Sequence, residues 1–369
     1  MRRKQGSIDY KILITTIILI IIGSVMVFSA SWPYATRIQN DPYHFVKKQI
    51  IFLIIGFVAM YITSKIDYKI YKQYAVILYI LTICLSIIVL FTGDVETYSA
   101  KRWITIKSIT IMPSDFLKLG TIFAISRYIS SNYKKINTIA YGFVPMILFA
   151  AISGFLVYKQ PDLSTTLVIL ALIVSMFIIA GIDMKYFTLA VLGIGAVGII
   201  GIIGSKSIYS RSSRIEAWLD PLKDFSNTGW QLAQSLFAIS YGGFFGVGIG
   251  KSRHKFSYLS EAHNDFIFAI ICEELGFIGA MIIILLYIYL IYLGMKLAFS
   301  LKDVFAKFLV IGIMLLLGIQ SFTNIAVALG LIPPTGLTLP FISYGGSSLI
   351  VYMTMIGIVL NVSRTVNRR

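Results

Sequence analysis

Long apolar segments, separated by short polar ones, repeat along the whole chain of 369 residues. A helix that crosses a bilayer needs about 20 apolar residues, and segments of roughly this length recur throughout. They cover residues 11–31, 46–64, 74–92, 112–130, 138–158, 163–181, 185–204, 264–295, 304–329 and 343–362. The pattern predicts an all-α polytopic membrane protein with ten transmembrane helices, as a single domain over residues 1–369. The eighth segment exceeds what a bilayer requires and is expected to tilt or to project beyond the membrane.

Composition supports this class, because 57% of the residues are hydrophobic and only 13% are charged. Soluble domains carry about 25% charged residues. In the ten-helix arrangement the basic residues gather on the side that holds both termini, which the positive-inside rule places in the cytoplasm. They are Arg2, Arg3, Lys4, Lys11, Lys65, Lys69, Lys72, Arg127, Lys134, Lys135, Lys296, Lys302, Lys307, Arg364, Arg368 and Arg369. The formal charge of +16 is therefore better explained by membrane topology than by nucleic-acid binding.

The opposite, extracytoplasmic side carries the largest connection, about residues 205–263, between the seventh and eighth helices. Connections of this length are usually functional or disordered, and aromatic residues such as Trp230 argue against disorder. Residues 229–239 have apolar positions at helical spacing, which predicts an amphipathic helix at the membrane interface. Residues 324–348 are rich in Pro and Gly, and irregular backbone at membrane depth must line protein or a cavity.

Acidic residues mark the eighth segment. Asp265 lies at the membrane boundary, and Glu273 and Glu274 lie deeper. A carboxylate at bilayer depth costs a few kcal/mol or more, so such acids indicate chemistry, transport or helix pairing. Eight helical residues would separate Asp265 from Glu273 by about 12 Å. Since the carboxylates of inverting glycosidases lie roughly 6.5–9.5 Å apart, we do not expect an acid–base pair here.

Other charged side chains can be interpreted as structural. Asp115 and Lys118 stand three residues apart, so they form either a stabilising ion pair or part of a functional site. Asp162 can cap the helix that follows it. Glu273 or Glu274 is expected to orient helices by pairing with a buried cation such as Lys118. The histidines are scattered, so a zinc site is not expected.

Several segments of the chain carry a resemblance to a known family. They are Ala100-Lys-Arg-Trp103, Pro113-Ser-Asp-Phe-Leu-Lys118, Gln160-Pro-Asp-Leu163, Trp230-Gln-Leu-Ala-Gln-Ser235, Glu261-Ala-His-Asn-Asp265-Phe, Glu273-Glu-Leu-Gly276 and Pro340-Phe-Ile-Ser-Tyr-Gly-Gly-Ser-Ser348. With these segments in this order, the chain resembles the SEDS family of bacterial shape, elongation, division and sporulation proteins. It most resembles the division and sporulation branch of that family. Asp115 stands where Glu is more usual, and Ser260 and Asn264, which replace the more usual Pro and Thr, flank Asp265.

The resemblance implies a peptidoglycan glycosyltransferase that polymerises lipid II into β-1,4-linked glycan strands at the outer face of the cell membrane. It implies a role in septal or sporulation wall synthesis, with an elongation-type role as the alternative. The implied partners are a class B penicillin-binding protein, the division or sporulation machinery and membrane lipids.

In this reaction an acceptor hydroxyl loses a proton, and Asp265 is the expected general base. The pyrophosphate leaves as an anion and needs charge stabilisation. Candidate substrate- and phosphate-binding residues are Lys101, Arg102, Lys118, Lys159, Arg211, Arg214, Ser343 and Ser347, although Arg211 and Arg214 could equally be solvated loop charges. Expected supporting residues are Asp115, Asp162, Glu273, Glu274, Gln160 and Trp230. A divalent cation, Mg²⁺ or Mn²⁺, could assist with Asp162 as its ligand.

Two other function classes stay open. Buried acids and broken helices also occur in lipid II flippases and other transporters. Against transport, the polar segments cluster on one side and no inverted repeat is visible in the sequence. The third class is a non-catalytic activator of the penicillin-binding protein.

Overall fold

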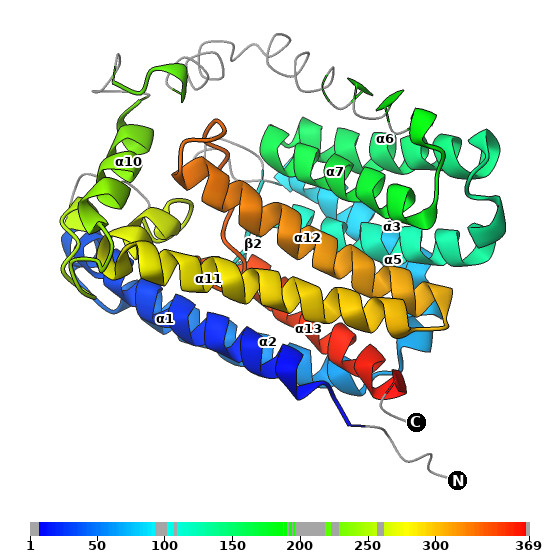
Figure 1. Cartoon of the computed structure of the whole chain (residues 1–369), viewed down its shortest axis with the longest axis horizontal. Coiled ribbons are helices and arrows are strands. Elements are labelled where there is room, and N and C mark those ends of the chain that lie inside the picture. Colours follow the sequence, from blue (N-terminus) through cyan, green and yellow to red (C-terminus); the bar gives the residue numbers. More distant parts are fainter. Residues whose placement is uncertain are drawn as a thin grey trace.

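The computed structural model describes residues 7–92, 102–106, 109–186, 188–189, 192–193, 195, 218–222, 229–256 and 262–366. Its long helices lie side by side along the length of the molecule, and the shorter α10 stands across one end of them (Figure 1). In chain order the α-helices are α1 (Tyr10–Gln39), α2 (His44–Lys65), α3 (Tyr68–Thr92), α5 (Pro113–Asn132), α6 (Val144–Lys159), α7 (Leu163–Ala180), α10 (Trp230–Gly242), α11 (Ile267–Ser300), α12 (Val304–Ala328) and α13 (Gly346–Val366).

Shorter elements connect these helices. A π-helical turn, Ile139–Phe143, leads into α6, and Tyr133–Lys135 and His254–Phe256 form 3₁₀ helices. Strands β1 (Ile104–Ile106) and β2 (Ile109–Ile111) pair as an antiparallel hairpin. This hairpin departs from the all-α prediction, and its alternation of Ile and Thr suits a strand because β-branched side chains pack well on a pleated surface.

The predicted membrane segments agree well with the helices of the described residues. Nine of the ten predicted segments coincide with a helix there, whereas most of the seventh, 185–204, lies outside the described part. Eight of the described helices are long and apolar enough to cross a membrane. Helix α5, which carries Asp115, Lys118 and Arg127, is not one of them. The structure therefore supports a multi-pass membrane protein without fixing the number of crossings.

Helix α12 forms the centre of the bundle. It packs against α5, α7, α11 and α13, and its Phe305 and Phe308 are fully buried. Peripheral helices instead expose large apolar side chains, such as Ile54 on α2, Leu81 on α3 and Phe155 on α6. Apolar residues on both the inner and the outer surface are expected where lipid replaces water around a helix.

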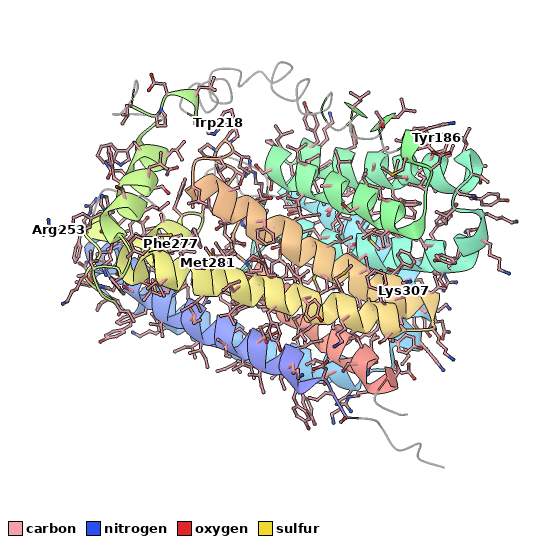
Figure 2. The ribbon with its side chains drawn as sticks, in the orientation of Figure 1. Tyr186, Trp218, Arg253, Phe277, Met281 and Lys307 are labelled. Carbon is pink, nitrogen blue, oxygen red and sulfur yellow. The ribbon has the colours of Figure 1, made fainter. Side chains whose placement is uncertain are left out.

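The start of α1 and the end of α13 lie at the same end of the bundle, where Asp9 N donates to Ser363 Oγ at 3.0 Å. The α2–α3 and α11–α12 connections lie there too, because the Tyr68 hydroxyl donates to Asp303 at 3.3 Å. Figure 2 labels Lys307 toward this end and Arg253 toward the other. Tyr68 N also donates to Asn361 Oδ1 of α13 at 3.0 Å, so these lysine-containing connections share one end of the bundle.

Element α11 consists of two helices that meet at Gly276, whose φ of 68° and ψ of −170° are not helical and favour glycine. A side chain there would overlap the backbone of Gly246, because the loop that follows α10 lies directly against α11. The helix before Gly276, from Ile267, is buried in protein. The helix after it runs to Ser300 and exposes large apolar side chains such as Leu285.

Candidate functional site

Asp265 lies in a turn formed by residues 262–266, directly before α11, and its side chain is half-buried. Three successive carbonyls of this turn accept hydrogen bonds. Tyr344 N donates to His263 O at 2.9 Å, Ser343 Oγ donates to Asn264 O at 2.7 Å, and Asn324 Nδ2 donates to Asp265 O at 2.8 Å. These protein donors take the place of water at the three carbonyl oxygens, and each hydrogen bond restricts the backbone conformations that the turn can adopt. The backbone of Asp265 is therefore fixed by α12 and by the segment before α13.

The irregular segment between α12 and α13 also lies beside the carboxylate itself. Gly336 has φ of 72°, and the position that a Cβ would take there lies 3.5 Å from Asp265 Oδ2. A side chain at position 336 would therefore touch the carboxylate, and glycine leaves the space beside it open. This agrees with the prediction that the Pro- and Gly-rich backbone lines protein rather than lipid.

His263 underlies the same turn and was not singled out from the sequence. Its ring is buried against Phe45, with centroids 4.4 Å apart, and lies 5.7 Å from the rings of Tyr34 and Tyr344. Burial lowers the pKa of His263 to about 4, because removal of the ring from water disfavours its charged form. A neutral imidazole thus joins α1 and α2 to the turn that carries Asp265. In the sequence, only its position two residues before Asp265 could have indicated that His263 supports the site.

Asp115 and Lys118 form a buried ion pair of 2.9 Å on α5. Lys118 Nζ also donates to Gln320 Oε1 at 3.0 Å, and Ser347 Oγ lies 3.5 Å from Asp115 Oδ2. Gln320 in turn donates to Thr338 O at 3.1 Å, so the cluster holds the segment before α13. Asp115 and Lys118 thus form the ion pair that their spacing allowed. Because Lys118 is only 2% exposed, its burial favours this structural role over the predicted contact with phosphate.

The two predicted serine ligands also have internal partners. Ser343 Oγ accepts from Leu339 N at 2.7 Å in addition to its bond to Asn264 O, and Ser347 Oγ accepts from Met112 N at 3.1 Å. Both serines are buried. Their hydroxyls therefore stabilise the backbone around the site, which favours support over direct substrate contact.

Glu274 pairs with Lys255 rather than with Lys118, so the partner suggested from the sequence was wrong. Lys255 Nζ lies 2.8 Å from Glu274 Oε1, and both side chains are fully buried. Ser29 Oγ of α1 donates to the same carboxylate at 2.7 Å. The expected structural role, pairing with a buried cation, is what these contacts provide. They join α1, α11 and the 3₁₀ helix His254–Phe256 in the loop that follows α10.

Glu273 holds the same loop from the neighbouring position. Its carboxylate accepts from Arg253 N at 2.8 Å, lies 3.0 Å from His254 Nδ1 and accepts from Ser252 Oγ. The side chain is fully buried. Glu273 and Glu274 both bind residues of the loop that follows α10. These contacts favour a structural role for the two carboxylates over proton transfer beside Asp265.

The turn between α6 and α7 lies near β1. Asp162 caps α7, as predicted, with Oδ1 accepting from Thr165 N at 3.1 Å and Oδ2 accepting from Thr165 Oγ1 at 2.8 Å. Gln160 Nε2 donates to Ser86 O at 3.0 Å, which agrees with a supporting role. Arg102 donates to the carbonyl of Pro161. The turn is therefore fixed on both sides.

The contacts of Asp162 are those of a helix cap. Both carboxylate oxygens accept hydrogen bonds from Thr165, and the side chain is buried. Within the described ranges, no group of three or more His, Cys, Asp or Glu side chains could hold a metal ion. These observations favour capping as the role of Asp162, and a divalent cation held there together with substrate phosphates stays a prediction.

The remaining predicted residues differ in how the structure places them. Lys159 is exposed at the end of α6, with Nζ 5.3 Å from the ring centroid of Phe155. Trp230 begins α10, whose Ser235 donates to Ala328 O at 2.7 Å and so ties this helix to α12. Four other residues lie outside the described part of the chain: Lys101, Arg211, Arg214 and Ser260.

Comparisons with known proteins agree with this architecture. The family model described as "Cell cycle protein", which covers FtsW, RodA and SpoVE, matches residues 10–368. The chain is 38% identical over 366 residues to stage V sporulation protein E of Bacillus subtilis, with 99% of both chains covered. It is 37% identical over 358 residues to the probable peptidoglycan glycosyltransferase FtsW of Trichlorobacter lovleyi, with 96% of this chain and 93% of the relative covered.

Solved structures share the same fold. The crystal structure of the Thermus thermophilus rod shape determining protein RodA matches with a TM-score of 0.72 at 25% identity, over 97% of each chain. A chain from a peptidoglycan synthase complex matches with a TM-score of 0.80 at 24% identity, over 98% of this chain and 99% of that one. The likeness extends over nearly the full length in both cases.

Proposed function

The chain belongs to the FtsW/RodA/SpoVE family of cell cycle proteins, and from this premise we propose that it is a peptidoglycan glycosyltransferase whose general base is Asp265. The observation that carries the proposal is the fixed, half-buried carboxylate at the start of α11. Its backbone is held through the carbonyls of residues 263–265, and its side chain lies beside Gly336, which has no side chain to cover it. A base needs this combination of fixed position and access to its substrate.

In the proposed reaction, Asp265 takes the proton of the acceptor sugar hydroxyl as that oxygen attacks the anomeric carbon of the donor. The new glycosidic C–O bond forms while the bond from the anomeric carbon to the pyrophosphate breaks. Polyprenyl pyrophosphate leaves as an anion, and a single displacement inverts the α-linked donor to a β-linked product. No second carboxylate is required, which agrees with the separate roles of Glu273 and Glu274.

Cations at the Asp265 end would stabilise the leaving pyrophosphate. Among the described candidates, Arg102 and Lys159 suit this role best, because Lys159 ends α6, Arg102 donates to Pro161 in the α6–α7 turn, and neither is fully buried. Arginine suits phosphate because its planar N–H groups match phosphate oxygens. Lys101, Arg211 and Arg214 stay predictions for the same role.

We further propose that the Asp265 end faces the outside of the cell. The opposite end carries the lysine-rich connections, which the positive-inside rule assigns to the cytoplasm. Lipid II would then enter from the outer leaflet, and a class B penicillin-binding protein would cross-link the new strand. The full-length similarity to SpoVE and FtsW supports a role in sporulation or division rather than elongation.

The test is to give the purified protein fluorescent lipid II in proteoliposomes, with and without a class B penicillin-binding protein. We expect glycan polymer from the wild type, and loss of polymer in both Asp265→Asn and Asp265→Ala. Lipid II that crosses the bilayer without polymer would favour transport. Polymer made by the partner alone, and merely accelerated by both the wild type and the variants, would favour an activator.

A further inference from the structure

Asn324 links the backbone of the proposed base, Asp265, to the irregular segment between α12 and α13. It lies on the last turns of α12 and is buried. Its Nδ2 donates at 2.8 Å to the carbonyl of Asp265, which lies 59 residues earlier in the chain. It also donates at 2.6 Å to the carbonyl of Leu337, which lies 13 residues later. One amide group thus uses both of its N–H bonds to join two distant segments.

The two segments meet where the base is positioned. Leu337 directly follows Gly336, where an added Cβ would lie 3.5 Å from Asp265 Oδ2. Asn324 therefore holds the backbone of the base next to the backbone segment that lies beside its carboxylate. Asp, Leu or Ala at this position could not donate two hydrogen bonds to carbonyl oxygens.

We propose that Asn324 is a positioning residue for Asp265, an inference that rests on the proposed function. It touches no reacting atom in this scheme and acts through the backbone carbonyl of the base. A displacement of about 1 Å at a reacting group can lower the rate about 100-fold, so loss of this link should lower turnover strongly. Substrate affinity should change little, because lipid II is bound by other groups.

The chain offers a matched control in Asn361 on α13. This asparagine is also buried and also joins two segments: its Oδ1 accepts from Tyr68 N at 3.0 Å, and its Nδ2 donates to Ser64 O at 3.0 Å. It lies at the opposite end of the bundle. Replacing it by leucine therefore removes the same number of internal hydrogen bonds without affecting the site.

The experiment compares Asn324→Leu and Asn361→Leu in the full-length protein, with lipid II as substrate, well below their melting temperatures. Both variants should melt earlier than the wild type. Only Asn324→Leu should show a fall in kcat, about 100-fold, with KM little changed. If Asn324→Leu does not fold, Asn324→Ala leaves room for water to solvate the two carbonyls and carries the same expectation.

Wild-type kcat in a folded Asn324 variant would overturn the inference, and so would an equal fall in kcat for Asn361→Leu. Failure of the proposed function is a different result. It would appear as a wild type that forms no glycan, or as an Asp265→Asn variant that is as active as the wild type.

Discussion

Replacing Lys255 by methionine would leave the Glu274 carboxylate without its cation inside the protein. Both side chains are fully buried, with Nζ 2.8 Å from Oε1, and Lys255 also donates to Ser29 Oγ at 3.1 Å. Methionine has nearly the length of lysine, so the change removes a charge and little volume. Removing one member of a buried ion pair destabilises a protein by about 3–5 kcal/mol, because the remaining charge has no partner.

The loss can be measured as an apparent melting temperature of the protein in detergent. At roughly 2 °C per kcal/mol for a chain of this size, we expect Lys255→Met to melt about 6–10 °C below the wild type. The control is Lys47→Met, which breaks the pair of Lys47 and Asp41. That pair is equally short, at 2.7 Å, but its side chains are 67% and 34% exposed. Exposed pairs contribute about 0–1 kcal/mol, so a shift of at most about 2 °C is expected.

A second comparison isolates the charge. The double variant Lys255→Met, Glu274→Gln removes both charges of this pair and should recover much of the lost melting temperature. The reasoning is refuted if Lys255→Met melts no earlier than Lys47→Met. It is also refuted if the double variant is as unstable as Lys255→Met alone.

Two further predictions concern stability. Acid should destabilise the protein through His263: its pKa of about 4 lies below the ordinary 6.5, so below pH 6.5 the unfolded chain binds a proton that the folded chain does not. The loss is about 2 kcal/mol at pH 5, and the melting temperature of His263→Phe should depend less on pH; a profile identical to that of the wild type would contradict this. Gly276→Ala should destabilise the fold by about 1–3 kcal/mol and so lower the melting temperature, because φ is 68° and the new Cβ meets the backbone of Gly246. The control, Gly318→Ala, meets only the end of Ile291 at 3.4 Å, and equal melting of the two variants would count against the reasoning.

The parts of the fold that the sequence predicted depend on local patterns. Apolar length located the membrane helices, because each helix satisfies its own backbone hydrogen bonds in lipid. Asp162 was recognisable as a cap, and Asp115 and Lys118 as a pair, because both interactions join residues three positions apart. The β1–β2 hairpin was missed because its strands are only three residues long.

The contacts that build the site could not be predicted because they join distant segments. Glu274 finds its cation 19 residues earlier, in a loop whose path the sequence does not determine. In the sequence, Asn324 is a single polar residue in an apolar helix. Its role becomes visible only in the structure, where it donates to the carbonyls of Asp265 and Leu337. Ser343 looked like a ligand by its motif, yet its hydroxyl fixes the turn of Asp265. Side-chain type indicated polarity, and only the fold showed which polar groups already have partners.

The most direct test of the central claim is the rate of lipid II polymerisation by Asp265→Asn beside that of Asp162→Asn. Both changes remove one carboxylate at the same end of the bundle. Asparagine caps a helix about as well as aspartate, so Asp162→Asn should polymerise lipid II like the wild type. Asp265→Asn removes the base and should be slower by about 10²–10⁴-fold. Equal rates for the two variants, whether both high or both low, would contradict the assignment of Asp265.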